Sequence, residues 1–215
     1  MLFKDRIQAG QELAKKLLKY KDKDVIILAI PRGGVVVAYE IAKELNAPLD
    51  LIIPRKIGAP YQPELAIGAV TQDGTIILNE DIVSYLPIPE NYIKAEAERQ
   101  KKEIERRLIK YRGSAIEPNV ENKIVIIVDD GIATGATMIA AIVSIRKKKS
   151  LKIIVAIPIA PLESLEKIKK YADEIVCLQT PEPFFAIGQF YERFEQIEDE
   201  EVINILNKSK ELSKK

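Results

Sequence analysis

The fold of this chain is decided by the stretch IVIIVDDGIATGAT, residues 124–137. Its first five residues are β-branched, and the run stops at two adjacent carboxylates, Asp129 and Asp130. Small and hydroxylated residues follow, and an apolar-periodic segment then runs over 138–145 and ends in a basic run at 146–149. This order predicts a buried strand, a loop and a helix.

The loop between the predicted strand and helix has the features of an anion site. The first backbone N–H groups of a helix have no partner within the helix, and the helix dipole favours negative charge beside them. Thr134 and Thr137 add hydroxyl donors, and Gly135 permits a close backbone approach. We therefore expect a phosphate group here. The alternative is an ordinary strand–helix turn capped by an aspartate, which requires neither a second acid nor both threonines.

The two carboxylates suit a sugar beside that phosphate. Asp129 and Asp130 are expected at the carboxyl end of a parallel strand, where open α/β sheets place their ligands. Carboxylates accept hydrogen bonds from sugar hydroxyls and hold water around Mg²⁺. A ribose 5-phosphate fits both features, with its diol at the acids and its phosphate at the loop.

Residues 128–137, VDDGIATGAT, resemble the phosphoribosyl pyrophosphate (PRPP) signature of the type I phosphoribosyltransferases. Other common phosphate loops fit poorly, because the chain has neither a GxxxxGKS/T motif nor a GxGxxG motif after a strand. The resemblance implies that Asp129 and Asp130 are catalytic at the ribose and hold Mg²⁺ indirectly, through water or the ribose. It also implies that the PRPP 5-phosphate is bound by Ala133, Thr134, Gly135, Ala136 and Thr137.

A second glycine-containing loop follows the apolar run at 24–30 and precedes a predicted helix at 35–45. The loop is Pro31-Arg32-Gly33-Gly34. Its glycines let backbone amides point inward, and the planar guanidinium group of Arg32 is suited to binding phosphate. Alone, this pattern also fits a turn that needs glycine for its backbone angles. The family resemblance implies that Arg32, Gly33 and Gly34 bind pyrophosphate, in a loop that often contains a cis peptide.

A basic pair, Arg55 and Lys56, follows the predicted third strand at 48–54. Two cations at a strand end suit a mobile loop that closes over phosphates, although a solvated basic pair is the alternative. The Asp-Gly pair at 73–74, between two apolar runs, predicts a hairpin. The resemblance implies a flexible antiparallel hairpin over about 55–80, in which Arg55 and Lys56 are catalytic and Glu64 is a carboxylate partner.

Aromatic residues concentrate near the C-terminus, at 184–191. With the prolines before them they form either a hydrophobic hood over a flat ring or a satellite core under a loop. The hood hypothesis assigns the acceptor base to Phe185, Phe190 and Tyr191, within a hood and C-terminal segment over about 180–215.

Composition limits the remaining function classes. The 33 basic and 32 acidic residues give no overall excess that favours nucleic acid or an anionic membrane, and no apolar run is long enough to span a bilayer. Cys177 is the single cysteine, so the chain has no internal disulfide. We expect Cys177 to lie in the core and the protein to be cytoplasmic. Because the chain has no histidine, acid–base chemistry must use carboxylates, lysine, tyrosine or the substrate.

Alternating strand and helix patterns predict one α/β domain over 1–215, with a twisted parallel sheet, helices on both faces, and the hairpin and hood added to it. Residues 90–111 predict a long helix with many charge pairs and a narrow apolar stripe. That helix fits a dimer element as well as a solvated face, and we expect a homodimer.

We therefore predict a Mg²⁺-dependent phosphoribosyltransferase that transfers ribose 5-phosphate from PRPP to a nitrogen acceptor, a nucleobase or similar group, and releases pyrophosphate. Family members that use 6-oxopurines carry a third acid where this chain has Ala133, so the loop resembles the adenine type more closely. A second hypothesis is a PRPP- or nucleotide-sensing regulator without turnover, and a third is another phosphosugar enzyme on the same scaffold. The acceptor stays open.

Overall fold

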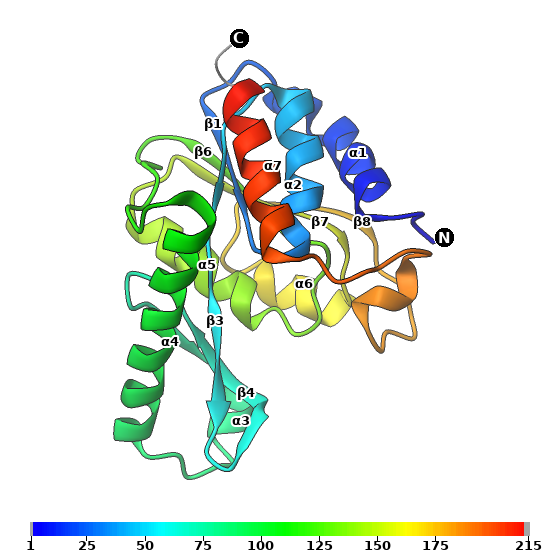
Figure 1. Cartoon of the computed structure of the whole chain (residues 1–215). Helices are drawn as coiled ribbons and strands as arrows, with labels where there is room; N and C mark the ends of the chain where they lie inside the picture. The colour runs from blue at the N-terminus through cyan, green and yellow to red at the C-terminus, as the bar shows by residue number, and fades with distance from the viewer. Residues whose placement is uncertain (1, 213–215) are drawn as a thin grey trace.

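The structure, a computed structural model, describes residues 2–212, so residue 1 and residues 213–215 of the predicted domain and C-terminal segment lie outside the described part. Its centre is a five-stranded parallel sheet with the strand order β2-β1-β6-β7-β8 (Figure 1). This confirms the predicted parallel α/β architecture. The strands are β1 (Val25–Ala29), β2 (Leu49–Leu51), β6 (Ile124–Val128), β7 (Lys152–Ile159) and β8 (Glu174–Gln179).

The central strands are buried on both faces, which explains their unbroken apolar sequence. Successive side chains of a strand point to opposite faces. Accordingly, Ile126 and Val128 of β6 join one core cluster, whereas Val125 and Ile127 join the other. All four side chains are fully buried, so the sheet is the shared wall of two cores.

Helices cover both faces of the sheet (Figure 1). On one face α2 lies between α1 and α7, and on the other lie α5 and α6. The first helix begins after Asp5, whose side chain accepts a hydrogen bond from the backbone N–H of Gln8. The second ends at Asn46 in the left-handed conformation. The bounds are α1 (Arg6–Leu17), α2 (Gly33–Leu45), α5 (Ala136–Lys147), α6 (Leu162–Ile168) and α7 (Asp199–Leu212), with short 3₁₀ turns at Leu18–Tyr20 and Ile187–Phe190.

The predicted hairpin region forms a separate antiparallel sheet of three strands, ordered β3-β4-β5. It projects away from the parallel sheet together with α3 (Figure 1). The Asp-Gly turn predicted at 73–74 joins β4 to β5, and the Asp73 carboxylate accepts hydrogen bonds from the hydroxyls of Thr71 and Thr75. The elements are β3 (Arg55–Ala59), β4 (Gln62–Val70), β5 (Ile76–Leu78), α3 (Glu80–Val83) and α4 (Glu90–Arg112).

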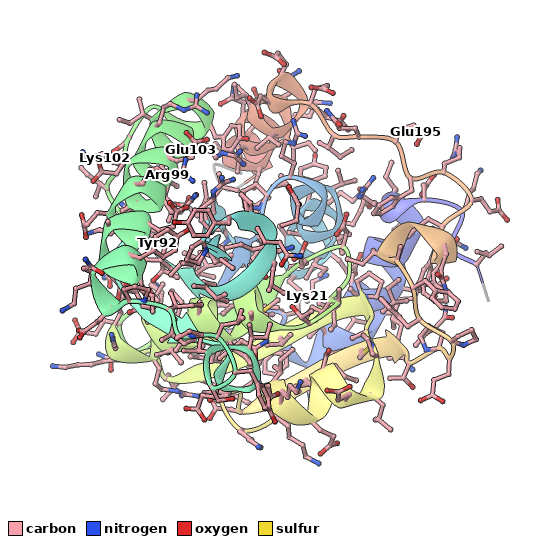
Figure 2. All side chains as sticks on the ribbon, turned by 90° about the horizontal axis from the view of Figure 1, so that it is seen from below. Lys21, Tyr92, Arg99, Lys102, Glu103 and Glu195 are labelled. Atoms are coloured by element: carbon pink, nitrogen blue, oxygen red, sulfur yellow. The ribbon has the colours of Figure 1, made fainter. Side chains whose placement is uncertain are left out.

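The long helix α4 packs its apolar stripe against β3 and the core, as its sequence pattern predicted. Its outer face carries charge pairs one turn apart, such as Glu103 with Arg107 at 2.8 Å. Figure 2 shows Tyr92, Arg99, Lys102 and Glu103 along this helix. Surface pairs of this kind contribute at most about 1 kcal/mol each, so the buried stripe is what fixes α4 in place.

One expected boundary is wrong: the apolar run at 151–157, followed by Pro158, predicts a strand that ends at the proline, but β7 continues through it to Ile159. Proline removes a backbone donor and usually interrupts a ladder. The neighbouring strand β6, however, ends opposite Ala156, so its ladder does not extend to Pro158. On the other side, Ile157 and Ile159 pair with β8, and the strand therefore passes through the proline.

None of the helices within residues 2–212 is both long and apolar enough to cross a membrane.

Candidate functional site

Two of the predicted ligand loops leave neighbouring strands at the same edge of the parallel sheet. Ala29 at the end of β1 pairs with Val128 at the end of β6. The backbone N–H of Ile30 also donates to the carbonyl oxygen of Val128 at 2.8 Å, which carries the pairing one residue further. The loop at 31–34 and the acids at 129–130 therefore begin side by side.

The glycines of the first loop lie directly against the acids. A Cβ atom on Gly33 would come within 1.9 Å of Asp130 Oδ2, and one on Gly34 within 2.9 Å of the Asp129 Cα atom. No side chain fits at either position, so both residues must be glycine for this approach. The peptide bond between Pro31 and Arg32 is cis, as the family resemblance implied.

Asp130 is held by an arginine that no sequence motif singles out. Arg6 Nε donates to Asp130 Oδ2 at 2.7 Å, and the two side chains are only 9% and 12% exposed. The Arg6 guanidinium also lies 3.8 Å from the ring centroid of Phe194 and donates through Nη1 to the carbonyl oxygen of Glu195 at 2.9 Å. A residue of the first helix thus joins the acid pair to the C-terminal segment.

Asp129 lies beside Asp130 at the end of β6 and is half-buried. Its Oδ1 accepts a hydrogen bond from the backbone N–H of Asp130 at 2.8 Å. Burial, followed by the negative charge of Asp130, raises the pKa of the Asp129 carboxyl well above its usual value. The two acids therefore form an interacting pair at the strand end, which is the one place where adjacent residues can serve one ligand.

The predicted phosphate loop ends at the start of α5. Gly135 precedes the helix with φ of +84°, and its conformation is left-handed. Among the described residues no side chain caps this helix, so its first N–H groups point into the loop. Ala133 and Thr134 are exposed, whereas Ala136 and Thr137 are half-buried. The Ser164 hydroxyl donates to the carbonyl oxygen of Ala133 and fixes the loop to α6.

A cleft of about 520 Å³ opens beside this loop. Its walls come from the phosphate loop, from α6, and from the β5–α3 part of the hairpin region. It is lined by residues that include Leu78, Asp81, Ala133, Thr134, Ser164 and Lys167.

The cationic residues predicted to bind pyrophosphate are dispersed. Arg32 lies 3.7 Å from Asp199 Oδ1 at the start of α7. Arg55 Nε donates to Gln100 Oε1 on α4 at 2.9 Å, and burial, followed by the charge of Arg107, lowers the pKa of Arg55. Lys56 and Glu64 are exposed on the hairpin sheet. The structure therefore brings Gly33 and Gly34 to the acids but not Arg55, Lys56 or Glu64, and the roles given to these three stay predictions.

The aromatic residues near the C-terminus are divided between core and surface. Tyr191 is 6% exposed, its ring stacks on Phe194 with centroids 5.0 Å apart, and its hydroxyl donates to the carbonyl oxygen of Asp130 at 2.6 Å. Phe190 packs on Phe184 at 5.2 Å, whereas Phe185 is 83% exposed. For Tyr191 this favours the satellite core over a surface that stacks on a base.

Gly131 allows the 3₁₀ turn at Ile187–Phe190 to pack on the signature loop. A Cβ atom at Gly131 would come within 2.7 Å of Ile187 Cγ2, so the 3₁₀ turn packs directly on the signature loop. Sequence reasoning identified neither this contact nor Arg6, Phe194 or Ser164, because each contact joins residues far apart in the chain.

Cys177, predicted to be a core residue, is half-buried, and burial raises the pKa of its thiol to about 11.

The chain is similar to a known protein family and to several known proteins. The phosphoribosyl transferase domain family matches residues 3–194. A Mycobacterium tuberculosis protein named "Putative phosphoribosyl transferase Rv0571c" is 44% identical over 208 residues, which are 97% of this chain and 47% of that protein. The chain thus spans about half the length of the curated relatives it matches.

Two solved structures are similar to the chain. The crystal structure of TT1426 from Thermus thermophilus superposes with a TM-score of 0.82 at 38% identity and covers 97% of this chain and 99% of that one. The AQ2163 protein from Aquifex aeolicus, at 18% identity and a TM-score of 0.50 over 80% of this chain and 73% of that one, shares the fold. Since the family matches nearly the whole chain, the protein belongs to the phosphoribosyltransferase family.

Proposed function

We propose that this protein binds PRPP with Mg²⁺, transfers the ribose 5-phosphate to a nitrogen acceptor of the nucleobase type, and releases pyrophosphate. The observation that carries the proposal is the direct contact of Gly33 and Gly34 with Asp129 and Asp130. A pyrophosphate loop and a ribose-binding acid pair must meet in this way if one ligand is to bridge them. The family membership supports the same interpretation.

The phosphate loop provides the anchor for the substrate. The N–H groups at the start of α5 and the hydroxyls of Thr134 and Thr137 would hold the 5-phosphate. Gly135 in its left-handed conformation keeps the backbone clear of the ligand. Fixing this end of PRPP places its ribose over the strand ends and so contributes to catalysis by positioning.

The acid pair would act at the ribose. Positive charge develops on the sugar ring as pyrophosphate departs, and two carboxylates fixed beside the ring stabilise it. Asp129 and Asp130 are suited to this because they lie close together, Asp130 buried and Asp129 half-buried, and because Arg6 and the protein backbone already order them. No covalent nucleophile is required of the protein.

The departing pyrophosphate would lie in the 31–34 loop. The backbone N–H groups of the loop and Arg32 would hold the pyrophosphate. Arg55 and Lys56 would approach the pyrophosphate if the hairpin sheet closed over the ligand. Within residues 2–212 no cluster of three or more carboxylate or thiol groups could hold a metal ion by itself. Asp129 and Asp130 would hold Mg²⁺ through water or ribose hydroxyls, and the ion would neutralise charge on the pyrophosphate.

The phosphate loop disfavours one class of acceptor. Ala133 stands where the family's 6-oxopurine enzymes carry an acid, so hypoxanthine and guanine are disfavoured. Phe185 is the one predicted hood aromatic that is strongly exposed, and it is available to contact a flat acceptor.

Calorimetric titration with PRPP, with and without Mg²⁺, tests the proposal. A pyrophosphate-release screen across nucleobases and amines then follows. We expect Mg²⁺-dependent binding, release with one acceptor class, and loss of release when Asp129→Asn and Asp130→Asn are combined. Absence of PRPP binding would overturn the proposal. Binding without release by any acceptor would indicate a sensor instead.

A further inference from the structure

Arg6 is the one cation buried against the acid pair, among residues 2–212, that neither the sequence motif nor the proposed reaction accounts for. It is the first residue of α1 and lies 124 positions from Asp130 in the chain. Most arginines are exposed, and a buried one requires partners for both its charge and its N–H groups. Its partners therefore indicate what it does.

Three contacts hold the Arg6 guanidinium. Nε donates to Asp130 Oδ2 at 2.7 Å, Nη1 donates to the Glu195 carbonyl oxygen at 2.9 Å, and the group lies 3.8 Å from the Phe194 ring centroid. Figure 2 shows Glu195 in the extended segment that leads to α7. A planar fork on an aromatic face can satisfy all three contacts at once, whereas a lysine ammonium cannot.

The acid pair needs such a partner. Asp130 is buried and Asp129 half-buried at the strand end, and two uncompensated carboxylates in that position repel each other. A positive charge at Asp130 offsets this repulsion and fixes the carboxylate in one orientation. The same carboxylate also receives the close approach of the pyrophosphate loop, since a Cβ atom on Gly33 would lie 1.9 Å from Asp130 Oδ2 and 2.7 Å from Arg6 Nε.

The C-terminal segment reaches Asp130 from a second direction. The Tyr191 hydroxyl donates to the Asp130 carbonyl oxygen at 2.6 Å, and Tyr191 stacks on the same Phe194 ring that Arg6 covers. Side chain and backbone of one signature acid are thus both bonded to the assembly formed by Arg6 and the 191–195 segment.

We propose that Arg6 is a positioning residue that holds Asp130 in place for the ribose of PRPP and connects that acid to the 191–195 segment. The inference rests on the proposed function, because it assigns Asp130 to the ribose. Arg6 acts through Asp130 and does not contact the substrate. It gives the N-terminal helix a role in substrate recognition.

The chain offers a matched control at the same junction. Arg193 also connects the 191–195 segment to the start of α1, but its ion pair is with Asp5 and not with either acid of the pair. Its side chain is 54% exposed. Substituting Arg193 therefore removes a link between the same two segments without changing the surroundings of Asp130.

The experiment measures Mg-PRPP affinity by calorimetry for Arg6→Met, Arg6→Lys and Arg193→Met, with thermal unfolding to verify that each variant is folded. We expect Arg6→Met to weaken binding roughly ten-fold or more, because a buried carboxylate loses its counter-charge. Arg6→Lys restores the charge but not the contacts to Phe194 and Glu195, and should recover a large part of the affinity. Arg193→Met should stay within about two-fold of the wild type.

A double-variant comparison isolates the route through Asp130. If Arg6 acts through this acid, adding Arg6→Met to Asp130→Asn changes affinity far less than Arg6→Met does alone. Equal losses in Arg6→Met and Arg6→Lys, or in Arg6→Met and Arg193→Met, would overturn the positioning role and show a purely structural contact. A folded wild type that fails to bind PRPP would instead overturn the proposed function, and the inference with it.

Discussion

The edge of the parallel sheet and the antiparallel hairpin sheet are built in opposite ways. At the edge, Gly33 and Gly34 lie against the two acids, and Arg6 is buried against Asp130. The Tyr191 hydroxyl donates to the Asp130 carbonyl oxygen. On the hairpin sheet Lys56 is exposed, and Tyr61 at the turn between β3 and β4 is fully exposed. One half of the candidate site is preformed, and the other presents Lys56 to solvent.

The difference indicates a division of labour. Groups that must stabilise charge on the ribose work best when they are already ordered, because they then need not reorganise during the reaction. Groups that cover a leaving group must admit the substrate first and so cannot be packed in advance. We therefore expect substitutions at the sheet edge to alter both stability and binding, and substitutions on the hairpin to alter binding alone.

The largest effect is expected for Gly33→Ala. The added methyl group would clash with Asp130 and Arg6. This overpacking should lower the free energy of unfolding by about 1–3 kcal/mol. PRPP binding should be lost with it, because the loop moves away from the acids. Urea unfolding and calorimetry measure the two quantities.

A control for Gly33→Ala is Gly113→Ala at the end of α4. Gly113 has φ of +77° and no atom within 4 Å of an added Cβ, so the change costs about 1 kcal/mol of backbone strain and leaves PRPP affinity unchanged. Unaltered PRPP affinity in Gly33→Ala would contradict the preformed edge.

The next effect is expected for Tyr191→Phe, which removes the donor to the Asp130 carbonyl oxygen. A buried acceptor left without its partner costs about 1 kcal/mol of the free energy of unfolding. Urea unfolding checks this value, with Tyr85→Phe as the control because Tyr85 is 86% exposed. Equal stability of Tyr191→Phe and wild type would show that this bond does not fix the C-terminal segment.

A smaller effect, dependent on pH, is expected at the opposite end of the parallel sheet, where Glu174 begins β8. Burial would raise the pKa of Glu174, but hydrogen bonds from Lys152, Lys19 and the Tyr20 hydroxyl outweigh it and lower the pKa to about 2. Since the folded-state pKa lies below the usual value, this contribution is present above about pH 4.5 and is lost as the pH falls toward 2.

Glu174→Gln should therefore reduce the free energy of unfolding by about 1 kcal/mol at pH 7, a modest value because the cluster is partly open to solvent. The difference from wild type should shrink on acidification, while PRPP affinity at pH 7 stays the same. Denaturant unfolding across this pH range measures it, and a difference that grows toward low pH would contradict the assignment.

Much of the fold was predictable because local patterns carried it. The β-branched run at 124–128 can be little else than a buried strand, and the acids after it fall at a sheet edge whatever surrounds them. The strand through Pro158 was missed because the effect of a proline depends on where the neighbouring strand ends, and no local pattern contains that information.

The site was predictable only where one continuous motif carried it. Arg6 lies among the polar residues of an amphipathic helix, where an arginine ordinarily faces solvent, so its burial could not be read from the sequence. Tyr191 was open to two interpretations because an aromatic cluster packs equally well on a ligand or on itself. Both residues depend on contacts with Asp130 that only the folded chain brings together.

The smallest effect on stability, and the sharpest test of the hairpin half, is expected for Lys56→Gln. Lys56 is exposed, so the free energy of unfolding should change by less than about 0.5 kcal/mol. If the hairpin closes over pyrophosphate, the loss of one charge-assisted contact should still slow pyrophosphate release roughly ten-fold. Lys102→Gln, an exposed lysine on α4 (Figure 2), should alter neither quantity. Equal release rates in Lys56→Gln and Lys102→Gln would show that the basic pair is only a solvated surface, and the contrast between a preformed edge and a closing hairpin would then lose its second half.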